Sequence, residues 1–168
     1  MIFLLIYLAL SAVLYAFLRK FTGKHRFVMP KSAVCFYVLT FTWGLPMTLA
    51  GAFTALALIA SGRRPKRYKR AMMFEHGSSW GVSLGPVFIS PASSEHVKSH
   101  EYGHGIQNAY LGPFMITAVA IPSAVRFWIR RAARKLKKAP ASGYEDIWFE
   151  KSATYALPEP GDPRSGRG

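Results

Sequence analysis

The sequence predicts an α+β membrane protein in which N-terminal transmembrane or embedded helices precede a small unit of strands and helices. Three observations lead to this fold class. A continuous apolar run begins the chain at Ile2–Leu18, short β-prone runs bounded by turn residues follow in the middle, and a capped helix carries the string HEYGH. Apolar runs of about 17–25 residues are typical of membrane helices, and short β-prone runs between turn residues indicate strands.

The apolar run Ile2–Leu18 is uncharged, and two cations follow it at once. A signal peptide has its charges before the apolar stretch, so this arrangement predicts an uncleaved anchor helix with its C-terminal end in the cytosol. A second apolar run, Ala33–Ala60, is interrupted by Gly44 and Pro46. It is either a kinked span or a re-entrant hairpin that turns at WGLP, and a spanning or deeply buried helix pair is favoured.

The chain of 168 residues has a formal net charge of +14, and its cations gather in blocks at 19–31, 63–70 and 126–138. Each block is next to a long apolar run, which favours the cytoplasmic flank of a membrane segment over a nucleic-acid site. We therefore expect an integral protein of the cell membrane, with anionic lipid headgroups as partners and no nucleic acid. The part that follows the anchor helices is expected on the cytoplasmic face.

The sequence divides into three predicted parts: membrane anchor helices at 1–62, a metal-binding domain at 63–157 and a disordered tail at 158–168. The predicted elements of the middle part are, in order, a β-hairpin of Ala71–Phe74 and Val82–Ile89, a helix from Ser93 or Ser94 to a stop at Gly112 and Pro113, an apolar helix kinked or split at Pro122, and a short helix at Ile147–Leu157. The apolar helix either dips into the membrane, with its arginines at the headgroups, or is buried in the core beneath the site.

The string HEYGH places His100 and His104 four residues apart on the predicted helix. Residues at i and i+4 lie on one helix face about 5–6 Å apart, so both imidazoles can bind a single ion. Zn²⁺ suits two imidazoles and a carboxylate, with a fourth position open to water. Glu101 is one step round the helix, where a general base acts on that water. Gly103 costs about 1 kcal/mol of helix propensity, which suggests that a close neighbour packs there.

The third ligand is expected from the downstream segment, where Glu145, Asp146 and Glu150 are the acidic candidates. Glu150 is favoured because apolar residues flank it, and a buried carboxylate needs a partner that a metal ion supplies. His96 extends the histidine stripe by one turn. Three histidines on one straight helix spread over about 12 Å, which is too far for one ion, so His96 is expected to line the pocket instead.

The segment HEYGHGIQNAYLGPFMITAVAIPSAVRFWIR, followed by YEDIWFEKSATYAL, resembles small bacterial membrane proteins with an HEYGH-x-x-Q helix and a late Glu-x-x-Ala helix. That late helix resembles the one in the Glu-zincin metallopeptidases. The resemblance implies a zincin-like domain with His100 and His104 as zinc ligands, Glu101 as general base and Glu150 as third ligand. The chain departs from the pattern at Thr154, where the family often has an aspartate that supports a histidine ligand.

The leading hypothesis is a membrane-anchored zinc metallopeptidase-like protein that hydrolyses a bond in a peptide or protein substrate. One alternative is a non-catalytic membrane protein with a structural zinc site. The other is a basic protein of the membrane surface in which HExxH is incidental. Membrane-embedded site-2 proteases also use HExGH, but their third ligand lies in an Asn-Pro-Asp-Gly-like stretch that this chain lacks.

Overall fold

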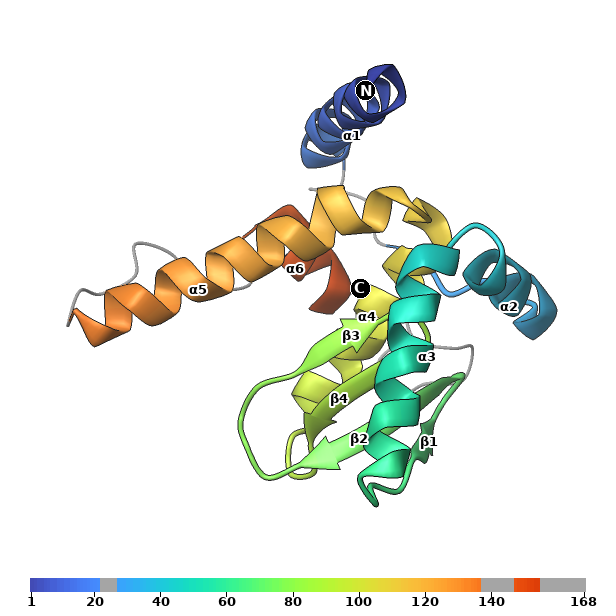
Figure 1. Ribbon diagram of the computed structural model, residues 1–168, viewed down its shortest axis with the longest axis vertical. Coiled ribbons are helices and arrows are strands. Elements are labelled where there is room, and N and C mark those ends of the chain that lie inside the picture. The colour runs from blue at the N-terminus through green and yellow to red at the C-terminus, as the bar shows by residue number, and fades with distance from the viewer. Residues whose placement is uncertain (22–26, 137–146, 155–168) are drawn as a thin grey trace.

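The fold is α+β: a small mixed sheet lies between helices, and a long apolar helix is the first element (Figure 1). A computed structural model describes residues 1–21, 27–136 and 147–154. The helices are α1 (Ile2–Phe21), α2 (Ala33–Phe41), α3 (Leu45–Ala60), α4 (Glu95–Leu111), the π-helical turn η1 (Ile116–Ala120), α5 (Ile121–Lys135) and α6 (Trp148–Thr154). The strands are β1 (Lys66–Tyr68), β2 (Ala71–His76), β3 (Val82–Leu84) and β4 (Val87–Pro91). The α+β class is confirmed, and the tail predicted at 158–168 lies outside the described residues.

The sheet has the strand order β1-β2-β4-β3 and mixes parallel with antiparallel pairs. β2 runs parallel to β4, whereas β1 and β3 are antiparallel to their neighbours. The predicted hairpin between Ala71–Phe74 and Val82–Ile89 is therefore wrong. The second run is two strands, because Gly85 takes a φ of +64° and Pro86 follows it, so the chain turns back there and pairs with itself.

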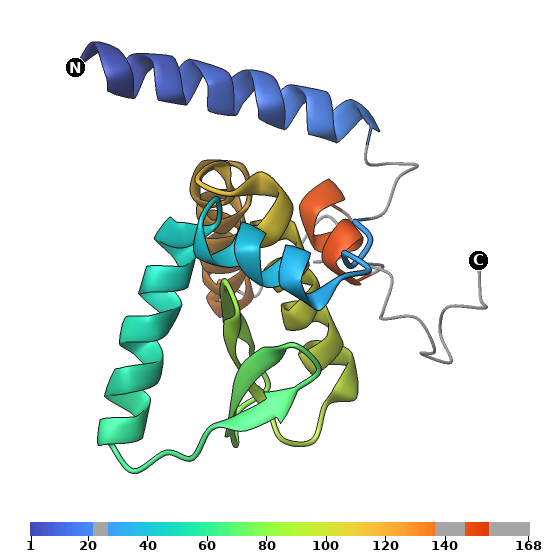
Figure 2. The ribbon, with the colours of Figure 1, turned by 90° about the vertical axis from the view of Figure 1, so that its right-hand side faces the viewer.

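α3 covers one face of the sheet and α4 covers the other, so the helix with the HEYGH string is held in a three-layer arrangement (Figure 2). The α3 backbone approaches the sheet at Gly51, where an added Cβ would lie 2.2 Å from the carbonyl oxygen of Leu84. On the α4 side, Phe88 and Ile106 are buried in one hydrophobic cluster. Residues 45–60, predicted as part of the anchor, thus also pack on the sheet.

Two segments qualify as membrane spans by length and composition. Among the residues that the structure describes, α1 is the one helix that is long and apolar enough by itself, a composition that anchors and signal sequences share. α2 and α3 qualify only as a pair, and they meet at 89°, as a broken span or a re-entrant turn would. At this bend, Trp43 donates its indole N–H to the carbonyl oxygen of Tyr110, 3.1 Å away, and ties the bend to the end of α4.

α4 begins and ends where the sequence predicts. Its N-cap is Ser94, whose hydroxyl oxygen accepts a hydrogen bond from the backbone N–H of Val97 at 3.3 Å. Its C-cap is Gly112, which has a φ of +57°. A Cβ at Gly112 would also lie 2.3 Å from Nε1 of Trp43, so both conformation and space require glycine there.

The apolar segment after α4 lies in two different environments that meet beside Pro122. In η1, Ala118 and Val119 are buried in the cluster that also contains residues of α6. In α5, Ile121 and Val125 are exposed. Of the two alternatives left open for this segment, the buried core helix describes η1 and does not describe α5, whose apolar side chains are exposed. The short helix predicted at Ile147–Leu157 is confirmed as α6, and 155–157 lie outside the described residues.

Candidate metal centre

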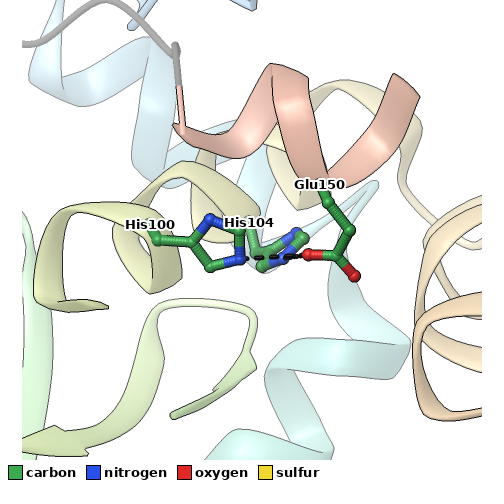
Figure 3. A group of neighbouring side chains, drawn as sticks. All are labelled: His100, His104 and Glu150. Carbon is green, nitrogen blue, oxygen red and sulfur yellow. Dashed lines mark hydrogen bonds and ion pairs between the residues drawn. The ribbon is translucent and has the colours of Figure 1, made fainter. Parts of the chain in front are cut away.

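Three buried side chains from two helices converge on one point (Figure 3). His100 and His104 project from α4, and Glu150 reaches them from α6. The Nε2 atoms of His100 and His104 lie 3.0 Å and 3.3 Å from Oε2 of Glu150, and one ligand atom from each residue lies within 4.8 Å of the other two. The structure thus brings together the three residues that the sequence predicts as metal ligands.

A close helix contact positions Glu150. Gly103 lies between the two histidines, and a Cβ added there would lie 2.1 Å from the carbonyl oxygen of Ala153. The backbones of α4 and α6 therefore touch, as the glycine in this position suggests. Trp148 and Phe149 anchor α6 in the core beside η1 and so hold Glu150 in a fully buried position.

The amide of Gln107 sets the tautomer of His104. Its Nε2 donates to the carbonyl oxygen of Phe149 at 2.8 Å and to the hydroxyl oxygen of Ser152 at 2.7 Å. Because the carbonyl can only accept, the amide oxygen must face the other way, toward Nδ1 of His104, 2.8 Å away. Nδ1 is therefore the donor, and in the neutral ring Nε2 directs its lone pair toward Glu150.

Thr154 does the same for His100. Its hydroxyl donates to the carbonyl oxygen of Glu150 at 3.2 Å and accepts from Nδ1 of His100 at 2.8 Å. Thr154, where the sequence departs from the Glu-zincin pattern, thus supports the first histidine. Two imidazole lone pairs and a carboxylate oxygen then face one another, and such a set of acceptors is stable only around a cation.

Without a metal, a proton supplies that positive charge. Burial lowers the pKa of His104, but the hydrogen bond and negative charge of Glu150 outweigh it and raise the pKa to about 9. Burial likewise raises the pKa of Glu150, but hydrogen bonds from His100 and His104 outweigh it and hold that pKa well below its usual range. Ser123 donates to the other carboxylate oxygen of Glu150. Glu150 is therefore ionised at neutral pH and can bind a cation.

Glu101 lies beside these ligands and has no part in their cluster. Its carboxylate rests against Gly81, where an added Cβ would lie 2.5 Å from Oε1 of Glu101. Burial raises the pKa of Glu101 to about 7, because the charged form loses water and Glu150 repels it. A carboxylate with such a pKa exchanges a proton readily at neutral pH.

Glu101, His100 and His104 line a cavity of about 280 Å³. Its other walls come from the edge strand β3 and the two residues before it, from Met47 of α3, from η1 with the preceding Met115, and from α5. Four side chains of α5 line the cavity: Ser123, Ala124, Phe127 and Trp128. The site therefore combines a buried ligand set, a carboxylate that can take a proton, and space for another molecule.

Other predicted residues lie elsewhere. His96 is exposed and does not line this cavity, so its prediction as a pocket residue is wrong; its side chain lies one turn nearer the start of α4. Glu145 and Asp146, the other candidates for third ligand, lie outside the described residues. No sequence pattern predicts a role for Gln107 or Ser123. The spacing of Gln107 from His104, three residues along one helix, could have indicated its contact.

The resemblance to Glu-zincins rests on the motif residues and stays a prediction. The geometry adds a buried group of two histidines and a glutamate that could hold a metal ion. Comparison of the chain with protein-family models, curated proteins and solved structures finds no match.

Proposed function

We propose that this protein is a membrane-anchored zinc metallopeptidase-like hydrolase. His100, His104 and Glu150 bind Zn²⁺, and Glu101 acts as the general base. The observation that carries this proposal is the convergence of three buried acceptor atoms, with both histidine tautomers fixed, beside a buried carboxylate that faces a cavity.

The donor set supports zinc in particular. Ligand atoms about 2.0–2.1 Å from a tetrahedral zinc ion lie about 3.3 Å from one another. The two Nε2–Oε2 distances, 3.0 Å and 3.3 Å, are close to that value, within a group of ligand atoms that spans at most 4.8 Å. Three protein ligands leave the fourth position free, as in catalytic zinc sites, whereas structural sites use four. The adjoining cavity therefore favours the catalytic reading over a purely structural zinc.

Each residue has a defined task in hydrolysis. Zinc, when bound, supplies Lewis acidity that polarises a carbonyl and makes water a better nucleophile at neutral pH. Glu101 accepts the proton of the attacking water and returns it to the leaving amine, for which its pKa of about 7 suits it. Ser123, through its hydrogen bond to Glu150, keeps that carboxylate directed at the histidines.

A peptide is the substrate that the sheet supports best. β3 is an edge strand, paired only with β4 among the described strands, and Val82–Leu84 line the cavity beside Glu101. The unpaired backbone groups of an edge strand can bind an extended peptide by adding it to the sheet. A peptide bound in this way would run past the metal ligands.

The apolar helix α1 supports membrane anchoring, and the basic blocks support a cytoplasmic site near anionic lipid headgroups. Zinc content and peptide cleavage test the hydrolase proposal. The full chain, purified in detergent, should contain about one zinc ion, and His104→Ala should contain far less. Glu101→Gln should keep the zinc and lose cleavage of a peptide mixture.

The outcomes separate the three hypotheses. A protein without zinc, whose stability is the same in His100→Ala and wild type, would exclude both zinc proposals and leave the membrane-surface role. Zinc that depends on the histidines, with no cleavage by the wild type or by Glu101→Gln, would favour the structural site. Cleavage that Glu101→Gln abolishes without loss of zinc supports the hydrolase.

A further inference from the structure

α5 turns its apolar face away from the protein. Ile121, Val125 and Ile129 recur every four residues, form one stripe, and are between 51% and 63% exposed, and Trp128 beside them is 63% exposed. An amphipathic helix of a soluble protein turns such a stripe toward the core. Here η1 supplies the core contacts, and α5 extends beyond the sheet with only its first turns beside α6 (Figure 1).

The rest of α5 is strongly basic. Arg130 lies on the side opposite the stripe, while Arg126, Arg131 and Lys135 flank it. The guanidinium of Arg131 lies 5.8 Å from the ring centre of Trp128, at the border between the apolar and charged surfaces. No acidic residue occurs between Ile121 and Lys138. An apolar stripe flanked by arginine and lysine, with a tryptophan at its border, is the pattern of a helix that lies in the surface of an anionic bilayer.

The same helix is a wall of the candidate active site. Ser123 donates a hydrogen bond to Glu150, and Phe127 lines the cavity. Trp128 lines the cavity as well and also belongs to the exposed apolar surface. A surface that contacts α5 through this stripe therefore lies next to the opening of the cavity.

A second apolar helix lies on the same side of the molecule. α1 packs on η1, where the hydroxyl of Thr117 donates to Ser11 at 2.9 Å, and just before η1 the hydroxyl of Tyr7 donates to the carbonyl oxygen of Pro113 at 2.8 Å. Figure 2 shows α1 passing above η1 and α5. The membrane-type helix α1 and the helix α5 thus both contact η1.

We propose that α5 binds the surface of an anionic bilayer through the stripe Ile121, Val125, Trp128 and Ile129, and that it holds the opening of the metal-site cavity at the headgroup layer. The lipid contact follows from α5 alone. On the proposed function, it further restricts substrates to polypeptide segments close to the membrane surface.

An environment-sensitive label tests the lipid contact in the full chain. Cys35, the one cysteine of the sequence, is first replaced by alanine. Single cysteines then replace Ala132, which is exposed beside the stripe, or Ala133, which is half-buried about 100° round the helix. Ala92, exposed at the end of β4 far from α5 in the sequence, gives a reference position. Each cysteine carries an NBD fluorophore, and the protein is reconstituted with phosphatidylcholine alone or mixed with phosphatidylglycerol.

In the anionic vesicles, the label at position 132 should shift to the blue and be quenched by doxyl lipids, more strongly than the label at 133 and far more than that at 92. Replacing Arg131 or Lys135 by glutamine should lower the equilibrium constant for contact between α5 and the bilayer about fivefold for each cation removed.

Three results would overturn the proposal. The label at 132 could report water in both lipid mixtures, as the label at 92 does. Its quenching could be the same with and without anionic lipid. Its blue shift could already be present in detergent and disappear on dilution, which would assign the stripe to a second copy of this chain. Zinc content, measured on the same samples, distinguishes failure of this proposal from failure of the zinc site.

Discussion

Replacement of Gly103 by alanine tests whether close helix packing sets the ligand geometry. The new Cβ would lie 2.1 Å from the carbonyl oxygen of Ala153, whereas real Cβ contacts stay beyond about 3.0 Å, so α6 must move away by about 1 Å. Overpacking of this kind costs about 1–3 kcal/mol, which alanine's better helix propensity offsets by about 1 kcal/mol. The same movement displaces Glu150, whose oxygen must lie within about 2.0–2.2 Å of a zinc ion.

Zinc affinity is therefore the sensitive measurement. We expect Gly103→Ala to weaken zinc binding by at least about 10–100-fold, the loss typical of a disturbed ligand support. Competition with a chelator of known affinity, on protein purified in detergent, measures it. Gly105→Ala is the matched control, because it lies on the same helix and its Cβ would approach only the carbonyl oxygen of Gly85, at 3.0 Å. It should change zinc affinity little and the free energy of unfolding by less than about 1 kcal/mol.

Zinc binding by Gly103→Ala that is as tight as zinc binding by Gly105→Ala would contradict this prediction. That result would mean that α6 does not depend on contact with α4 to present Glu150. A loss of zinc affinity in both variants would instead assign the effect to helix α4 as a whole.

Three further predictions concern the supports of the site. Glu150 raises the pKa of His104 to about 9, so zinc must displace a proton from His104 below that pH. Zinc affinity should therefore rise about tenfold per pH unit between about pH 6 and 8. A zinc affinity that does not change with pH in chelator competition would contradict this. Gln107→Ala should weaken zinc binding about 10–100-fold while far-UV circular dichroism stays unchanged, and unaltered affinity would show that the amide does not orient His104. Gly112→Ala should lower the melting temperature, because it forces a positive φ on alanine and a clash with Trp43; a melting temperature equal to that of the wild type would refute the close contact.

Local signals predicted the helices well and the strand pairing poorly. Ser94 and Gly112 were predictable as the two ends of α4, because capping depends on neighbouring residues only. The pairing of β2 with β4 depends instead on contacts between two strands that β3 separates in the sequence. No short-range pattern indicates such contacts. Two β-prone runs beside turn residues therefore suggested a hairpin, while the turn that forms one lies within the second run, at Gly85.

The metal ligands were predictable from the spacing of residues along a helix and from the free-energy cost of burying an unpaired charge. His100 and His104 follow from helix geometry, and Glu150 follows from the penalty for burying an unpaired carboxylate. The supporting contacts follow from neither rule. Thr154 reaches His100 across 54 residues of sequence, and its role depends on how α6 lies on α4.

The apolar stripe of α5 shows why exposure must be known as well as composition. The pattern of apolar and basic residues in this helix is the same whether its apolar side faces a core or a membrane. The structure shows that this side of α5 is exposed and lies outside the core, because η1 takes up the core contacts.

The distance in sequence between the ligands makes the order of assembly part of the function proposed for this chain. His104 and Glu150 are 46 residues apart, and α6 brings its carboxylate only after it has packed against Gly103 and Gln107. Two histidines on an isolated helix hold zinc weakly, so tight capture of the ion would follow the docking of α6. On the proposed function, hydrolysis would therefore begin only after α6 has packed on α4, and a bound metal ion would then stabilise the contact between the two helices.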